Sequence, residues 1–179
     1  MNWTILDKFV EIKSPWLTLI GEKIKNNQGK ILDYWRIEKA DSIIIITTYQ
    51  NQLIFPQLMF RAGVNQRTLD FAGGRLREGK TIEESALLIL NQELGLKADD
   101  LNSLEVINQQ SWQINSSFSN QNLWGFYAEI NPEKKLDQNL IGAIYQLNQI
   151  GIKQLLQDLT CLQCRALLLD WIIHNNLIQ

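Results

Sequence analysis

The chain has 179 residues, of which 45% are hydrophobic and 20% charged, a composition typical of one soluble globular domain and not of a disordered or fibrous chain. Its net charge of -2 lacks the concentrated lysine and arginine that nucleic acids and anionic membranes attract, so we expect neither as a partner. The longest apolar run is too short to span a bilayer, and residues 1–13 carry charges where a secretory signal needs an apolar core, so we expect a cytoplasmic protein.

The first sixty residues have the pattern of strands joined by short turns. Residues 16–24 and 31–40 extend on either side of a Gly/Asn turn, with apolar and polar side chains alternating. Residues 42–49, "SIIIITTY", are rich in β-branched side chains and apolar on both faces, which predicts a central strand covered on both sides. Pro56 lacks an N–H group, which predicts a sheet edge, a bulge or a strand end.

A helix is predicted to begin near Thr81 and to end at Gly95. Thr81 and Glu84 have the T-x-x-E spacing of a capping box, in which each residue bonds the other's backbone N–H. Gly95 stands where a glycine commonly closes a helix, because it adopts the left-handed backbone conformation at little cost.

The second half of the chain contains further strands and a helical end. Residues 103–114, 122–130 and 140–147 are strand candidates, and from Ile152 onward the pattern predicts one helix, or two broken near Thr160. Strands on both sides of a central helix, followed by C-terminal helices, predict an α/β or α+β fold with helices packed on a mixed sheet.

The two cysteines, Cys161 and Cys164, form a single C-x-x-C motif in the helical C-terminal stretch. Such a motif can be a redox pair or half of a zinc site. There is no second pair, and His174 is the only histidine, so we expect two structural thiols on a helix and a surface position for His174.

The stretch between Gly74 and Gly95 has the spacing of a known motif. Gly74 is followed by five residues, Lys80, seven residues and then "LILNQELGL". This resembles the Nudix box, G-x5-E-x7-R-E-U-x-E-E-x-G-U with U aliphatic, and the preceding "LDFAGG" is similar to the "LELPAG" segment of the ADP-ribose pyrophosphatase branch. If residues 74–95 were an ordinary turn and core helix, the similarity of the preceding "LDFAGG" to that branch would be unexplained.

The resemblance covers most of the chain and implies a Nudix-type α/β/α sandwich. It implies a single domain over residues 1–179, with an N-terminal strand region (1–40) and a Nudix core (41–179). Members of this branch are commonly homodimers joined through their N-terminal strands, so we expect a homodimer. Trp3, Trp16 and Trp35 are candidates for its interface.

In the resembling family, glutamates on one helix face hold Mg²⁺ or Mn²⁺, which polarises water for pyrophosphate hydrolysis. Here that face carries Ile89, Gln92 and Glu93, so one carboxylate of three remains. Lys80 replaces the first glutamate of the box and Leu88 replaces its arginine. These replacements predict that most of the metal-binding chemistry is lost.

Other positions of the resemblance complete the candidate site. Glu93, and Asp137 in the later loop, are the candidate catalytic residues, and Glu93 with the Gly73 carbonyl forms the candidate metal site. The candidate substrate-binding residues are Phe60, Arg61, Asp70, Gly73 and Gly74.

The resemblance therefore implies two functions that the sequence leaves open. The first is a catalytically silent or weak Nudix protein that binds a nucleotide diphosphate or a protein partner, or serves as a structural module, and needs no cofactor. The alternative is an active hydrolase that uses Mg²⁺ or Mn²⁺ to split the pyrophosphate bond of ADP-ribose or a similar nucleotide sugar.

Overall fold

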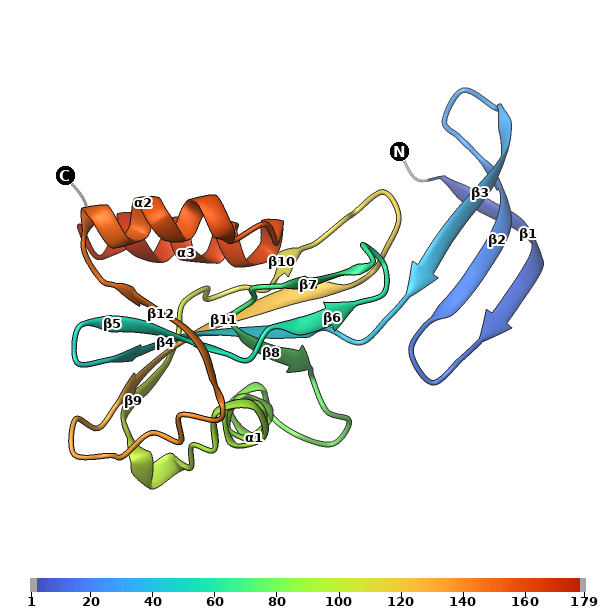
Figure 1. Ribbon diagram of the computed structural model, residues 1–179. Coiled ribbons are helices and arrows are strands. Elements are labelled where there is room, and N and C mark those ends of the chain that lie inside the picture. The colour runs from blue at the N-terminus through green and yellow to red at the C-terminus, as the bar shows by residue number, and fades with distance from the viewer. Residues whose placement is uncertain (1–2, 178–179) are drawn as a thin grey trace. The chain divides into compact units, whose positions relative to one another are not determined.

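The computed structural model describes residues 3–177, and the chain divides into two compact units (Figure 1). An N-terminal unit comprises Met1–Asp41 with Gln113–Asn122, and a larger unit comprises Ser42–Trp112 with Leu123–Gln179. The organisation into a single domain over residues 1–179 stays a prediction.

Three antiparallel strands form the N-terminal unit in the order β1-β2-β3, with bounds β1 (Thr4–Lys13), β2 (Thr18–Lys25) and β3 (Ile31–Glu38). The turn from β2 to β3 is stabilised because Asn26 Oδ1 accepts two backbone N–H groups and Gly29 adopts a φ of 81°. Residues 113–122 return to β3, where the Ile37 N–H donates to the Phe118 carbonyl at 2.8 Å.

Side-chain contacts also join these three strands. The rings of Phe9 and Trp35 meet edge to face at 5.4 Å across Gly21, where a Cβ would lie 2.6 Å from the Phe9 ring. The buried Glu22 accepts two hydrogen bonds of 3.0 Å from Arg36, and this guanidinium holds the pKa of Glu22 below its usual range. The charge of Glu22 is therefore compensated within the sheet.

A mixed sheet forms the centre of the larger unit, in the order β11-β4-β5-β12, with β8 also paired to β4 and β9 to β11. Its strands are β4 (Ser42–Tyr49), β5 (Gln52–Pro56), β8 (Ala72–Arg75), β9 (Leu101–Val106), β11 (Asn122–Ile130) and β12 (Ile141–Gln146). Only the pairing of β4 with β11 is parallel among these described strands. The central, buried position predicted for residues 42–49 is confirmed, and β5 ends at Pro56.

Short elements connect these strands. A small hairpin separates β5 from β8, a 3-10 turn follows the first helix, and a two-residue strand lies between β9 and β11. These elements are β6 (Met59–Arg61), β7 (Gln66–Thr68), η1 (Ala98–Asp100) and β10 (Trp112–Gln113).

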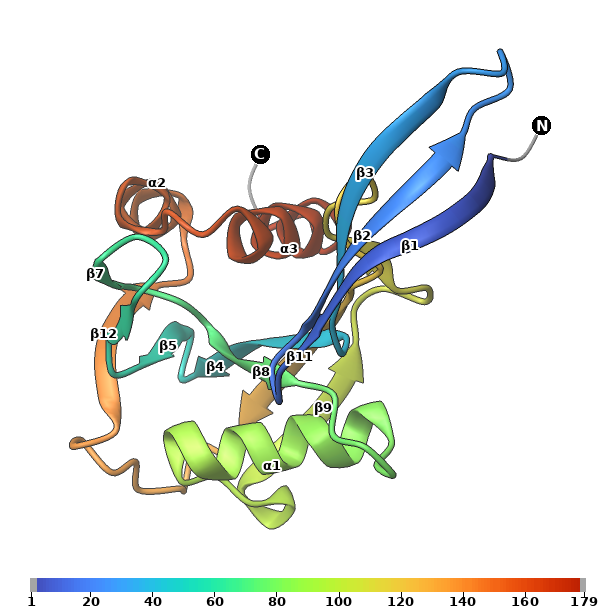
Figure 2. The same cartoon turned by 90° about the vertical axis from the view of Figure 1, so that its right-hand side faces the viewer.

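Helix α1 (Ile82–Leu94) covers one face of the mixed sheet. Thr81 Oγ1 accepts the Glu84 N–H at 3.2 Å, and Glu84 Oε2 accepts the Thr81 N–H at 2.9 Å, so the predicted capping box is confirmed. Gly95 ends the helix at a φ of 67°, also as predicted. Figure 2 shows α1 alongside β8, and the buried Leu90 and Leu94 pack into the core with residues of β4 and β11.

Helices α2 (Gln149–Asp158) and α3 (Leu162–His174) lie on the opposite face of the sheet from α1 (Figure 1). The helical stretch begins three residues before Ile152 and breaks near Thr160, which is the two-helix alternative of the prediction. The three layers form the expected α/β/α sandwich. Among the described residues, no helix has both the length and the apolar character needed to cross a membrane.

Candidate functional site

The three positions of the predicted metal face occupy different environments on α1. Ile89 is 3% exposed and belongs to the hydrophobic core. Its Cγ1 lies so close to Gly74 on β8 that a Cβ there would come within 3.0 Å of it. Gln92 is exposed, and only Glu93 is directed to the backbone of β8. The space beside Gly74 is therefore filled by an apolar side chain.

Glu93 makes a direct contact with the backbone of β8. Its Oε2 accepts the N–H of Gly73 at 3.1 Å. Burial raises the pKa of Glu93, while the hydrogen bond from Gly73 and the charge of Arg61 act in the opposite direction. Gly73 thus meets Glu93 through its N–H group, a donor that stabilises the carboxylate. The role of the Gly73 carbonyl as a metal ligand stays a prediction.

Arg61 and Asp70 form a tight ion pair beside Glu93. Asp70 Oδ2 accepts hydrogen bonds from Arg61 Nε at 2.9 Å and Arg61 Nη2 at 2.7 Å, and from Thr68 Oγ1 at 2.9 Å. The β6–β7 hairpin brings Arg61 to this position, and it leaves the neighbouring Phe60 ring 59% exposed. One exposed aromatic ring and one oriented guanidinium therefore lie on adjacent residues.

A narrow pocket joins Glu93 to this ion pair. It provides about 10 Å³, which is room for about one water molecule. Its walls are Pro56, Gln57, Met59, Arg61, Thr68, Asp70, Phe71 and Glu93. The structure thus brings the predicted residues Arg61, Asp70, Gly73 and Glu93 together, and a larger ligand has to bind over the pocket and not inside it.

Comparisons with known proteins identify the architecture. No family model and no curated protein matches the sequence. Among solved structures, the crystal structure of an ADP compounds hydrolase matches 99% of this chain and 98% of its own, with a TM-score of 0.77 and 16% identity. The chain has the Nudix fold. At this identity the likeness establishes the fold alone and leaves the activity to the residues of the site.

The residues of this Nudix fold do not fit the multi-carboxylate metal centre that the box implies. A hard divalent cation takes about six oxygen ligands. The α1 face offers one carboxylate, Glu93, and one of its oxygens is already bonded to the Gly73 N–H. Lys80 stands near the helix start and pairs with Glu84 at 3.4 Å. Among the described residues of this helix face, Glu93 alone offers a carboxylate oxygen to a cation.

Asp137 is exposed in the loop before β12, and its Oδ1 accepts the N–H of Asn139 at 3.0 Å. This hydrogen bond stabilises the loop itself. A catalytic role for Asp137 in the Nudix fold stays a prediction.

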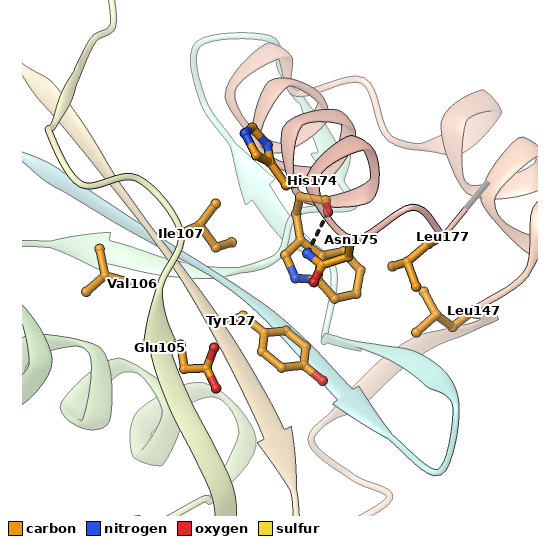
Figure 3. Close-up of a pocket in the computed structure, with 9 residues that line it drawn as sticks. Glu105, Val106, Ile107, Tyr127, Leu147, His174, Asn175 and Leu177 are labelled. Atoms are coloured by element: carbon orange, nitrogen blue, oxygen red, sulfur yellow. Dashed lines mark hydrogen bonds between the residues drawn. The ribbon is translucent and has the colours of Figure 1, made fainter. Parts of the chain in front are cut away.

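A second pocket, of about 370 Å³, was not predicted from the sequence (Figure 3). Figure 3 shows Glu105 and Tyr127, from the strands, and His174 and Asn175, from the end of α3, among its lining residues. Tyr127 stacks on Trp171 with ring centroids 5.0 Å apart. No motif marks these residues, because segments distant in the sequence form the pocket.

An acid lies beside the two cysteines, and no sequence pattern indicated it. Cys164 is buried, Cys161 is half-buried, and the donor atoms of both residues and of Asp70 all lie within 4.8 Å of one another. The pKa of Cys161 is lowered because the thiol of Cys164 and the backbone N–H groups at the start of α3 stabilise its thiolate. The pKa of Cys164 is raised by this interaction and by burial.

Proposed function

We propose that the larger unit is a nucleotide-binding Nudix domain that recognises the diphosphate of ADP-ribose or a similar nucleotide sugar and hydrolyses it weakly or not at all. The observation that supports the proposal is the combination of an exposed Phe60 and Arg61 with a helix face that keeps one carboxylate, Glu93, and buries Ile89 where the box has a glutamate. Arg61 and Phe60 remain available at the surface, while Ile89 fills the space beside Gly74. A binding function needs Arg61 and Phe60 and does not need carboxylates on α1.

Arg61 is suited to bind phosphate. Its side chain is 46% exposed, and Asp70 holds Nε and Nη2, so the guanidinium is oriented before a ligand arrives. Its remaining donors can bond phosphate oxygens, and an oriented arginine loses less conformational entropy on binding than a free one. The exposed ring of Phe60, on the preceding residue, can stack on a nucleobase.

The alternative is an active divalent-metal-dependent hydrolase. Glu93 would then be the metal ligand or the base, and Mg²⁺ or Mn²⁺ would be required. Activity would have to persist with one carboxylate on the helix face, although each lost acid–base or electrostatic group typically lowers the rate by about 100-fold or more.

Incubation with ADP-ribose and Mg²⁺ or Mn²⁺ separates the two functions. We expect no AMP above the level formed with the Glu93→Gln variant. Metal-dependent AMP formation that disappears in Glu93→Gln would establish the hydrolase and contradict the proposal that the domain binds ADP-ribose without hydrolysing it.

ADP-ribose binding is expected to depend on Arg61. We expect ADP-ribose to raise the melting temperature of the protein, with or without a chelator. Arg61→Ala should weaken binding by about 10- to 100-fold, the value of a charged hydrogen bond. Calorimetric titration measures the dissociation constant, and Lys153→Ala, an exposed cation on α2, is the control. Equal affinity in Arg61→Ala and Lys153→Ala would contradict this binding site.

We further propose that the protein is a homodimer that associates through the N-terminal unit. Trp3, Trp16 and Trp35 are 51%, 66% and 46% exposed, and Ile5 and Ile12 on β1 are each 59% exposed. So many exposed large apolar side chains on a three-stranded sheet and the segments next to its strands are typical of an interaction surface.

Light scattering during size exclusion tests this association. The wild-type protein is expected to elute with twice the chain mass, and Trp35→Glu should reduce it to the mass of one chain because a charge is costly in a buried interface. Ile173→Glu, a change at an exposed apolar position on α3, is the control. A wild-type monomer would refute the proposal.

A further inference from the structure

We propose that Asp70, Cys161 and Cys164 form a binding site for a thiophilic divalent cation of the Zn²⁺ class, separate from the Nudix box. The donor oxygen of Asp70 and the two sulfur atoms all lie within 4.8 Å of one another. Asp70 comes from the connection between β7 and β8, and the cysteines come from the start of α3. The fold thus brings three metal-binding groups together from two distant segments.

The local structure at the cysteines suits metal binding. Cys161 is the N-cap of α3 and Cys164 follows in the first turn, so the helix start places both sulfur atoms on the same side. The N-terminal end of a helix also stabilises negative charge, and thiolates are the form of cysteine that binds metals. Cys164 is 1% exposed and Cys161 is half-buried, which leaves access from the Cys161 side.

Asp70 has a carboxylate oxygen left for a cation. Its hydrogen bonds from Arg61 and Thr68 all reach Oδ2, and Oδ1 accepts none from the described residues. The side chain is 15% exposed, and its bonds to Arg61 fix its orientation. Outer partners of this kind orient metal ligands and support affinity.

The composition of this site selects the metal. Two thiolates with one carboxylate favour Zn²⁺ over Mg²⁺ or Mn²⁺, because soft sulfur ligands prefer soft or borderline cations. Three protein ligands also leave the fourth position of a tetrahedral zinc centre for water or a small ligand. The site does not depend on the proposed nucleotide function, although both share Arg61 through its ion pair with Asp70.

Metal binding by the full chain tests this site. The protein is reduced, mixed with Zn²⁺, desalted and analysed for metal, and Co²⁺ is used in parallel because cobalt–thiolate bonds absorb in the near ultraviolet. We expect one metal ion per chain, and the same amount in excess Mg²⁺. Cys161→Ser should weaken Zn²⁺ binding by at least about 10- to 100-fold, because removing even a residue that only hydrogen-bonds a metal ligand has an effect of this size.

Asp70→Asn and Cys164→Ser should also weaken binding, whereas Asp99→Asn and His174→Ala, exposed changes elsewhere in the larger unit, should not. Circular dichroism identifies any variant that fails to fold. If Cys164→Ser does not fold, the comparison of wild type with Cys161→Ser, a change at a half-buried position, decides the test. Failure of the reduced protein to retain Zn²⁺, or equal retention in Cys161→Ser, overturns the proposal. Zinc retention without ADP-ribose binding would contradict only the proposed nucleotide function.

Discussion

Ile89→Glu is expected to lower the free energy of unfolding by at least about 3 kcal/mol, whereas Gln92→Glu should change it by less than about 0.5 kcal/mol. Both changes restore a carboxylate that the Nudix box would carry. The difference follows from burial, since Ile89 is 3% exposed and Gln92 is exposed.

The carboxylate at position 89 would be buried without a partner. The side chain of Ile89 lies against Gly74 and packs with Leu90 and Ala86 in the core. A charged group placed there loses its hydration, and the nearest charged group of the box helix face, Glu93, carries the same sign. The cost therefore includes both desolvation and the loss of apolar packing.

Urea unfolding followed by circular dichroism measures the difference, and adding Mg²⁺ to Ile89→Glu gives the decisive comparison. In a face that no longer collects metal, Mg²⁺ should leave the stability of the variant unchanged. Recovery of most of the lost stability in Mg²⁺ would show that the introduced carboxylate and Glu93 form a metal centre, which contradicts the expectation that this face collects no metal even with a second carboxylate.

Local signals explain why the framework of this helix could be predicted. The capping box of Thr81 and Glu84 depends on residues three apart, and the ending at Gly95 depends on one backbone conformation. The continuous apolar run of β4 likewise indicates burial on both faces. Each of these features is decided within a few residues, so the sequence alone specifies it.

The site depended on contacts that no local pattern contains. The sequence places Asp70 and Arg61 in the binding region but does not show that they pair with each other. It also separates Asp70 from Cys161 and Cys164, which meet only because α3 packs on the sheet. Such proximity arises from tertiary structure, and spacing arguments are limited to one element.

The glycine at position 151 is expected to be among the most sensitive positions of the larger unit. Gly151→Ala should lower the free energy of unfolding by at least about 3 kcal/mol, the upper part of the range for overpacking. Gly151 lies in the first turn of α2, where its N–H donates to the Asn148 cap at 2.9 Å. A Cβ there would overlap the carbonyl oxygen of Gln146 in the strand that leads into the helix.

The expected cost is high because the clash is with backbone atoms. Gln146 is fixed by its pairing with Gln52 on β5, so the chain cannot relax without breaking a strand contact or the cap. At Gly125 the atoms nearest to a Cβ are side-chain atoms of Leu167, of which Cδ1 would overlap it and Cδ2 and Cγ would lie at 3.2 Å. A side chain can change rotamer where backbone cannot, so Gly125→Ala should cost less.

Gly63→Ala is the matched control, since no atom of residues 3–177 lies within 4 Å of a Cβ at Gly63 and its φ is not left-handed. Alanine there should be neutral or stabilise slightly by restricting the unfolded chain. Urea unfolding should show the largest loss in free energy of unfolding for Gly151→Ala, a smaller loss for Gly125→Ala and the smallest for Gly63→Ala. A Gly151→Ala protein as stable as Gly63→Ala would mean that the entry to α2 can shift, and that the turn between β12 and α2 does not fix the position of the C-terminal helices.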